Sequence, residues 1–195
     1  MKKWLVPIIL IALAVIFGVR VYNSTIRLEE NVEEAWGKVE SSYQRRSDLI
    51  GNLVKTVKGA ADFEKSTLES VINARAKATS INIDPTNITP EQLQQFNQAQ
   101  SGLSSALSRL LVTVERYPDL KANQNFLELQ SQLEGTENRI NVARDRFNET
   151  VKPYNKHIRT FPNNLLAGMF GFEKKAYFEA EEGSEKAPDV EFDFK

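Results

Sequence analysis

Residues 4–19 read WLVPIILIALAVIFGV and contain no charged side chain. A helix of about 20 apolar residues crosses the ~30 Å hydrocarbon core of a bilayer, because each residue rises ~1.5 Å. Trp4 and Tyr22 flank this run, and both carry rings that favour the headgroup region. Pro7 falls in the first turn, where its missing N–H costs little. The stretch therefore predicts a membrane-spanning anchor over residues 1–22.

A cleaved secretory signal is the alternative explanation, because Lys2 and Lys3 precede the apolar run. Cleavage requires small residues just after that run. The A-x-A-like triplet of this region, Ala12 to Ala14, lies inside the run instead. We therefore expect the anchor to be retained.

Composition narrows the possible classes of protein. The chain has 195 residues, so the part beyond the anchor suits one domain. A net charge of −1 does not favour nucleic acid as a partner. The absence of cysteine excludes disulfides, thiolate metal sites and thiol nucleophiles, and His157 is the one histidine. With no calcium-loop motif and no nucleophile elbow, we predict no cofactor, no metal site and no enzymatic activity.

Helical periodicity begins directly after the anchor. Apolar residues recur at spacings of three and four from Val32 to Val57, and no proline occurs from Asn23 to Ser80. This pattern predicts one continuous helix to about residue 80. The sequence IDPTN at residues 83–87 then predicts a turn.

Two more long helices follow. Thr89 precedes Pro90 and Glu91, which is an N-cap with proline at the first helical position, and the stripe that starts there runs to Tyr117. Pro118 ends that helix, and a third runs to about residue 160, with Pro153 expected to kink or end it. The short connections predict antiparallel neighbours.

The predicted fold is all-α. One N-terminal transmembrane helix continues into a long antiparallel bundle of three long helices plus a short C-terminal helix. The predicted divisions are a transmembrane anchor, a membrane-proximal stalk, the bundle and an acidic tail: residues 1–22, 23–50, 51–172 and 173–195.

Helix lengths suggest that the stalk has no partner in its own chain. At ~1.5 Å per residue, the first helix would reach ~85 Å past the membrane, the second ~40 Å and the third ~60 Å. With the turn near residue 85 at the far end, neither of the other helices would reach residues 23–50, unless Gly51 breaks the first helix. That stretch still carries an apolar seam of four residues, Val32, Trp36, Val39 and Tyr43.

An uncovered apolar seam predicts self-association or binding to another protein. We expect a homo-oligomer, with another membrane protein as a further possible partner. Two alternatives are that the seam lies against the lipid surface or that the C-terminal segment folds back onto it.

Charged residues inside the helical seams are the candidates for a role beyond packing. When residues of neighbouring helices are matched by their distance along the bundle axis, Arg75 falls within about a turn of Glu137 and Arg144. Such a buried polar layer fixes register if its charges are paired. A ligand or metal site in the same layer is the alternative interpretation.

A second predicted cluster combines residues of the first helix with the turn before the third. Its members are Arg45, Arg46, Asp48, Glu115, Asp119 and Lys121. The same matching of levels places this cluster at the membrane-proximal end of the bundle. We expect these charges to pair within the bundle or across subunits, since a long stalk would hold them away from phosphate headgroups.

The chain resembles the LemA family of bacterial membrane-anchored helical proteins. Trp36 and the following stretches carry the resemblance: residues 22–23 (YN), 43–50 (YQRRSDLI), 52–54 (NLV), 74–76 (ARA), 115–121 (ERYPDLK), 126–130 (FLELQ), 136–140 (TENRI), 143–144 (AR), 147–148 (FN) and 154–155 (YN). No single stretch is diagnostic, but their order covers most of the chain. Two positions depart from the family pattern: Gly51 replaces a usual proline and Phe147 a usual tyrosine.

The resemblance implies a helical bundle on one transmembrane helix, in a family whose biochemical activity is poorly defined. Some relatives are linked to membrane-organelle formation or to membrane protease and stress systems. The expected function is a single-pass scaffold that self-associates and organises membrane or partner proteins. The alternatives are a monomeric adaptor subunit of another membrane protein, such as a protease, and a ligand sensor or hydrolase built on Arg75, Glu137 and Arg144.

The expected location is the bacterial cytoplasmic membrane. Lys2 and Lys3 favour an N-terminus on the inside, whereas Arg20, Arg27 and Lys38 follow the apolar run and nearly balance them. A basic start before an uncleaved anchor favours export of the domain that follows. We therefore expect the bundle on the extracytoplasmic side.

Overall fold

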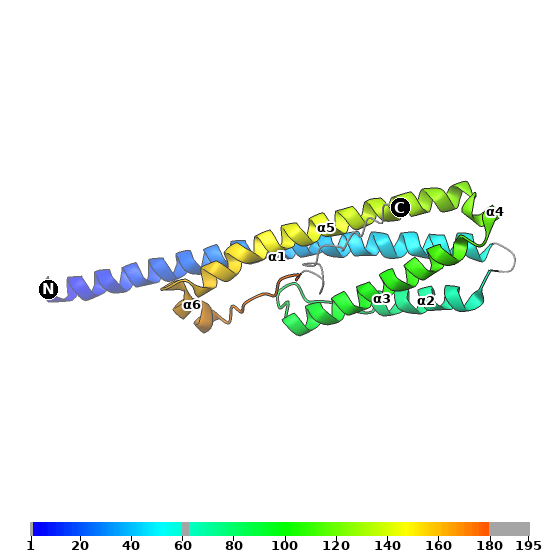
Figure 1. The fold of residues 1–195 in the computed structure, drawn as a ribbon. Helices are drawn as coiled ribbons and strands as arrows, with labels where there is room; N and C mark the ends of the chain where they lie inside the picture. Colours follow the sequence, from blue (N-terminus) through cyan, green and yellow to red (C-terminus); the bar gives the residue numbers. More distant parts are fainter. Residues whose placement is uncertain (1, 60–62, 180–195) are drawn as a thin grey trace, which may run out of the picture.

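The computed structural model describes residues 2–59 and 63–179, and the regular elements of that part are all helices. Figure 1 shows a long rod with one helix projecting from its end. The elements in chain order are α1 (Lys2–Lys58), α2 (Lys65–Thr79), α3 (Pro90–Val114), α4 (Pro118–Lys121), α5 (Gln124–Arg159) and α6 (Asn163–Phe170). The predicted all-α fold, with a long N-terminal helix packed against other long helices, is confirmed.

The N-terminal part of α1 stands clear of the bundle (Figure 1). Its apolar side chains are exposed, with Leu10 60% and Ile11 64% accessible, whereas burial begins at Val21. The helix is long and apolar enough to cross a membrane. Because exposing so many large apolar side chains to water is costly, this part of α1 has the character of a membrane anchor.

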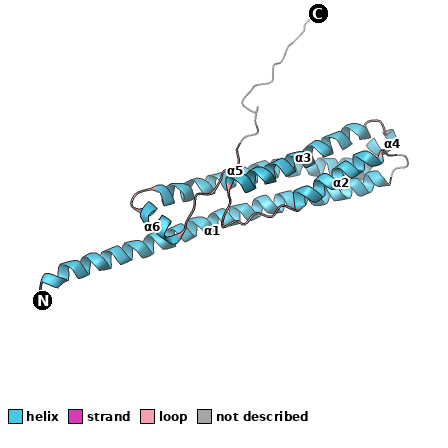
Figure 2. Ribbon diagram, turned by 90° about the horizontal axis from the view of Figure 1, so that it is seen from below, coloured by secondary structure: helices cyan, strands magenta, loops and turns pink. Residues whose placement is uncertain are grey.

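The remainder of the rod consists of two antiparallel helix pairs. α1 packs chiefly against α5, and α2 packs chiefly against α3, with further contacts from α2 to α1. Figures 1 and 2 show the two pairs lying lengthwise along each other. One core cluster fills the end of the rod far from the anchor, and the other fills the half beside the anchor.

The prediction of one continuous first helix to about residue 80 is wrong. α1 ends at Lys58, and α2 starts at Lys65 and runs back along the bundle. Gly59 follows the last helical residue, and glycine favours helix ends because it is a poor helix former. The spacing of apolar residues does not reveal this break. Val57 and Leu68 are three helical turns apart, so the apolar pattern continues across it.

The expectation that Val32, Trp36, Val39 and Tyr43 lack cover within the chain is also wrong. All four are buried in the core cluster next to the anchor, where Trp36 contacts the rings of Phe96 and Phe147. The early reversal at residue 59 explains the difference. Because the chain reverses near residue 59, the end of the rod far from the anchor lies at that residue. α5 and α6 can therefore run back along α1 as far as Tyr22.

Helix boundaries elsewhere follow local chemistry. Thr89 caps α3 as predicted: its hydroxyl accepts the Gln92 N–H, and the Gln92 side chain accepts the Thr89 N–H. α5 starts only at Gln124, after the four-residue α4, rather than directly after Pro118. The helix also continues through Pro153 to Arg159 instead of ending there.

Residues 173–179, hereafter the strap, follow α6 as an extended segment. The sequence places them in a loose acidic tail, but Lys175 and Phe178 are buried in the bundle. Phe178 stacks against Trp36, which confirms the alternative that the C-terminal segment folds back onto the seam. The rest of the predicted tail, residues 180–195, lies outside the described residues.

Candidate functional site

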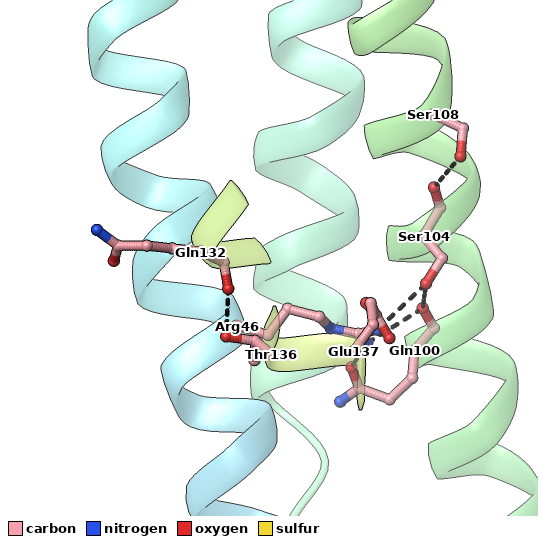
Figure 3. Close-up of polar contacts among 7 residues, drawn as sticks. All are labelled: Arg46, Gln100, Ser104, Ser108, Gln132, Thr136 and Glu137. Atoms are coloured by element: carbon pink, nitrogen blue, oxygen red, sulfur yellow. Dashed lines mark hydrogen bonds and ion pairs between the residues drawn. The ribbon is translucent and has the colours of Figure 1, made fainter. Parts of the chain in front are cut away.

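Arg46 joins three helices from inside the bundle. Its side chain is 4% exposed and leaves α1 to reach α3 and α5, as Figure 3 shows. One terminal nitrogen donates to the Glu137 carboxylate at 2.8 Å and to the Ser104 hydroxyl at 3.2 Å, and the other donates to the side-chain oxygen of Gln100. Such charge-assisted bonds are about twice as strong as neutral ones, so this group fixes the register of α1 against its neighbours.

Further residues extend the network. The Gln100 side chain donates in turn to the carbonyl of Ala78 at the end of α2, at 3.4 Å. The Arg46 guanidinium also lies 4.9 Å from the centre of the Tyr43 ring. Burial raises the pKa of Tyr43, against the opposing effect of Arg144 and Arg46. All four long helices therefore meet at one polar layer.

The structure does not join the three residues predicted for the buried layer. Glu137 pairs with Arg46, and Arg144 donates to the carbonyl of Glu179 and lies 4.7 Å from the centre of the Phe178 ring. Within the described chain, no hydrogen bond or ion pair links Arg75 to either of them. Arg46 occupies the place that the sequence assigns to Arg75.

Arg75 instead crosses α1 next to Gly51. Its Nε donates to the backbone carbonyl of Ser47 at 2.8 Å, and a terminal nitrogen lies 3.7 Å from the Asp48 carboxylate. A Cβ at position 51 would meet the guanidinium carbon at 3.4 Å, an ordinary van der Waals contact, so the crossing leaves space for a small side chain there. The contact ties α2 to α1.

The predicted membrane-proximal charge cluster is not assembled. The turn with Glu115, Asp119 and Lys121 lies at the end of the rod opposite the anchor, where Figure 1 labels α4. Glu115 pairs with Lys121 there. Arg46 and Asp48 bind the partners described above, and Arg45 is exposed. The predicted location of this cluster was wrong because the first helix was expected to end near residue 80, whereas it ends at Lys58.

Two asparagines of α5 hold the strap by paired hydrogen bonds. Asn155 accepts the N–H of Lys175 at 2.9 Å and donates to its carbonyl at 2.8 Å. Asn148 accepts the N–H of Phe178 at 2.9 Å and donates to its carbonyl at 2.9 Å. Each asparagine side chain thus pairs with both the N–H and the C=O of one strap residue, as a residue of a neighbouring β-strand would.

The spacing of these pairs follows from helix and strand geometry. Seven helical residues from Asn148 to Asn155 rise ~10.5 Å, and three extended residues from Lys175 to Phe178 span ~10 Å. The two repeats therefore match, and the strap runs antiparallel to α5. Ala176 adds a backbone bond to the carbonyl of Ile88, which ties the strap to the loop before α3.

Lys175 places a second charge inside the bundle. Its side chain is 2% exposed, and its ammonium contacts the Glu29 carboxylate at 2.9 Å and the carbonyls of Pro85 and Thr86 at 3.3 and 2.7 Å. These three acceptors match the three donors of an ammonium group. The ammonium also lies 5.0 Å from the centre of the Tyr154 ring.

Tyr154 completes this second group. Its pKa is raised well above the ordinary value, first by burial and then by the negative charge of the Glu29 carboxylate. Sequence reasoning missed Lys175, Asn148 and Asn155. The available signal was the pair of asparagines two turns apart on the core side of α5, followed by apolar residues at 176–178.

A surface groove of about 370 Å³ lies between α1 and α5. Most of the residues that line it are basic or polar, but the surface that they expose in the groove is mainly apolar, and Val142 is about half exposed. The lining residues are Lys38, Ser42, Asn138, Arg139, Val142, Ala143 and Arg146. Among the described residues, no three His, Cys, Asp or Glu side chains gather as a metal site would require.

The arrangement is suited to holding helices and a peptide in place. Both buried charges have their terminal nitrogens engaged by the chain itself, so these groups act as braces between elements. The groove, by contrast, presents charge and apolar surface to the outside.

The sequence profile of the LemA family matches residues 35–192, which include Arg46, Lys175 and the strap. Curated relatives span most of the chain. Magnetosome protein MamQ of Magnetospirillum gryphiswaldense is 28% identical over 174 residues, covering 80% of this chain and 64% of the relative.

Two further relatives show similar values. Magnetosome protein MamQ 2 of Paramagnetospirillum magneticum is 27% identical over 175 residues, covering 81% of this chain and 64% of its own length. Protein LemA of Metamycoplasma hominis is 26% identical over 160 residues, covering 82% and 69%. The chain thus spans less than two thirds of the MamQ proteins.

Proposed function

Because the chain belongs to the LemA family, we propose that it is a single-pass membrane-anchored scaffold that organises other proteins at a bilayer. One observation carries the proposal. The 57-residue α1 is unbroken from its exposed apolar start to the far end of the bundle. A partner bound to the rod would therefore be held at a set height and orientation above the membrane.

The buried chemistry supports a scaffold rather than an enzyme. Arg46 and Lys175 use their donors to tie helices, the loop before α3 and the strap together. The proposed role therefore needs neither a cofactor nor a catalytic group. The near-neutral net charge supports partners other than nucleic acid.

Self-association is part of the proposal, through a different surface from the seam. The seam around Trp36 is buried, whereas the groove around Val142 is open and exposes a mainly apolar surface between basic residues. Anchoring in a plane raises the effective concentration of identical chains, so a weak contact there suffices.

A monomeric adaptor of another membrane protein is the second candidate. The observation in its favour is that the chain covers its own seam, so the rod completes its core without a second copy. The groove would then receive the other protein.

We place the protein in the bacterial cytoplasmic membrane, with the bundle on the extracytoplasmic side. The exposed apolar part of α1 and the bacterial relatives support the membrane, and Lys2 and Lys3 before the apolar run support the orientation. Protease added to intact spheroplasts is expected to degrade the bundle. Protection of the bundle in intact spheroplasts together with its degradation after lysis would reverse the orientation.

Site-specific photo-crosslinking in native membranes tests the function. A photoreactive residue at Val142 is expected to capture protein, whereas one at Leu127, also on α5 and about half exposed, serves as the matched control. Captured copies of this chain support the scaffold, and one recurrent foreign membrane protein supports the adaptor. Equal or absent capture at both positions would contradict a binding role for the groove.

A further inference from the structure

α6 is a short apolar helix with well-defined ends. The helix follows Pro162 and ends at Gly171, which has a left-handed φ of 75°. The Phe172 N–H returns to the Ala167 carbonyl at 3.0 Å, the closure that such a glycine permits. From Thr160 to Phe172 there is no charged residue.

The outer face of α6 is unusually apolar for a surface. Leu165 and Met169 lie one turn apart on it and are 60% and 79% exposed, and Phe161, just before the helix, is 77% exposed. Ala167 faces the bundle and is buried. The helix therefore turns Leu165 and Met169 outward and the small Ala167 inward.

α6 lies at the end of the bundle from which the apolar part of α1 projects (Figure 1). The Phe170 ring meets the Tyr22 ring edge-on at 5.1 Å, and the Phe172 ring lies 5.8 Å from it. Tyr22 stands at the end of the apolar run of α1, and the 18 steps from Trp4 to Tyr22 span ~27 Å, close to the ~30 Å hydrocarbon core. Figure 1 shows α6 beside α1 where the bundle begins.

Basic residues frame the same region. Four exposed basic residues lie on the adjoining segments: Arg20 on α1, Lys156 and Arg159 in the last turn of α5, and Lys174 after α6. Glu173 is their exposed acidic neighbour. Lys and Arg beside an apolar surface favour anionic headgroups, with their chains extended toward the phosphates.

We propose that α6 is an interfacial membrane-binding element, with Phe161, Leu165 and Met169 inserted at the boundary between headgroups and acyl chains of the lipid bilayer. This inference rests on the proposed anchoring by α1. The anchor and α6 then hold the rod at two points, which fixes its tilt and rotation relative to the membrane. An amphipathic segment in this position inserts to a depth of ~5–10 Å.

Depth-dependent fluorescence quenching in liposomes tests the proposal. The chain has no cysteine, so single-cysteine variants of the full-length protein accept one environment-sensitive dye each. Met169→Cys reports on α6, Leu10→Cys on the anchor and Val112→Cys on α3, where the native side chain is also highly exposed. Vesicles of phosphatidylcholine and phosphatidylglycerol carry nitroxide either at the headgroup or deep on the acyl chain.

The expected result is strong quenching of the dye at 169 by shallow nitroxide, strong quenching at 10 by deep nitroxide, and several-fold weaker quenching at 112. Adding Leu165→Glu is expected to reduce quenching at 169 and leave quenching at 10 unchanged. Quenching at 10 without quenching at 169 would overturn the interfacial role and leave the anchor intact. Absence of quenching at both positions would overturn the anchor and this inference together.

Discussion

Arg46 shows at the residue scale how a full charge is accommodated between helices. Its terminal nitrogens engage a carboxylate, an amide oxygen and a hydroxyl, each from a different turn of α3 or α5. Burying a charge is expensive unless such partners are present, so their presence makes one arrangement of α1, α3 and α5 much better than its shifted alternatives. The residue gives specificity of packing rather than simple stability.

Replacing Arg46 tests this account. Arg46→Met keeps much of the side-chain length but leaves Glu137 and Gln100 without their charged donor, and we expect the free energy of unfolding to fall by about 2–3 kcal/mol. Chemical unfolding of the full chain in detergent, followed by circular dichroism, measures the change. Arg45→Met is the matched control, because Arg45 is exposed and surface substitutions stay within about 0.5 kcal/mol. Equal losses for the two variants would contradict the brace.

Tyr43 and Tyr154 predict a dependence of stability on alkaline pH. Burial raises the pKa of both phenols above the ordinary value of 10.0. The folded state therefore binds their protons more tightly, and their contribution is complete below pH 10 and is lost as pH rises above it. Unfolding measured between pH 8 and about 11.5 should show a decline that starts near pH 10 and is smaller in Tyr154→Phe. An identical decline in the variant would exclude a contribution from Tyr154.

At the scale of elements, α5 organises the membrane-proximal half of the rod. One side of the helix carries the ring of Phe147 into the core, and the adjacent side presents Asn148 and Asn155 to the strap. The strap thereby covers α1 and the loop before α3 without any strand to pair with. An extended segment is stable here because its polar backbone groups find partners on a helix.

Removing one clamp should loosen the strap. Asn155→Leu deletes two hydrogen bonds and leaves the buried N–H and C=O of Lys175 unpaired, so we expect a loss of about 2–4 kcal/mol. Hydrogen exchange should also rise at residues 174–179 before the helices open. Asn141→Leu is the control, because Asn141 is an exposed asparagine on the same helix. Unchanged exchange of the strap in Asn155→Leu would show that its aromatic contacts alone hold it.

At the scale of the whole molecule, the protein is a rod whose core runs along nearly its full length beyond the anchor. The cluster around Trp36 joins α1, α3, α5 and the strap, and the second cluster fills the far end. Because both halves are complete within one chain, the rod does not need a second copy to bury its apolar residues.

Trp36→Ala distinguishes a core role of the seam from an assembly role. We expect a loss of about 3–5 kcal/mol, typical of removing a large aromatic side chain from a core, with no change in the number of chains per particle. Unfolding experiments and light scattering of the detergent-solubilised protein measure the two quantities. A smaller particle with unchanged stability would instead restore the seam as an assembly surface.

Local chemistry was sufficient to predict several parts of this structure. The uncharged run at residues 4–19, the cap at Thr89 and the three-four spacing of apolar residues each depend on neighbours along the chain, and each matches the helices observed. The reversal after Gly59 was missed because the apolar period continues across it and no proline marks it. That single error shifted the predicted alignment of all later helices against the first one. The partners assigned to Arg46, Arg75 and the turn at Glu115 were therefore wrong as well.

The sequence alone determined that this protein is helical, that its first helix has the character of a membrane anchor and that charges lie within its seams. Only the tertiary structure decided which charges meet, that the seam at Trp36 is covered and that α6 lies beside Tyr22. The physical reason is that periodicity records which face of a helix is apolar. It carries no information about which distant segment covers that face, because any complementary stripe would bury it equally well.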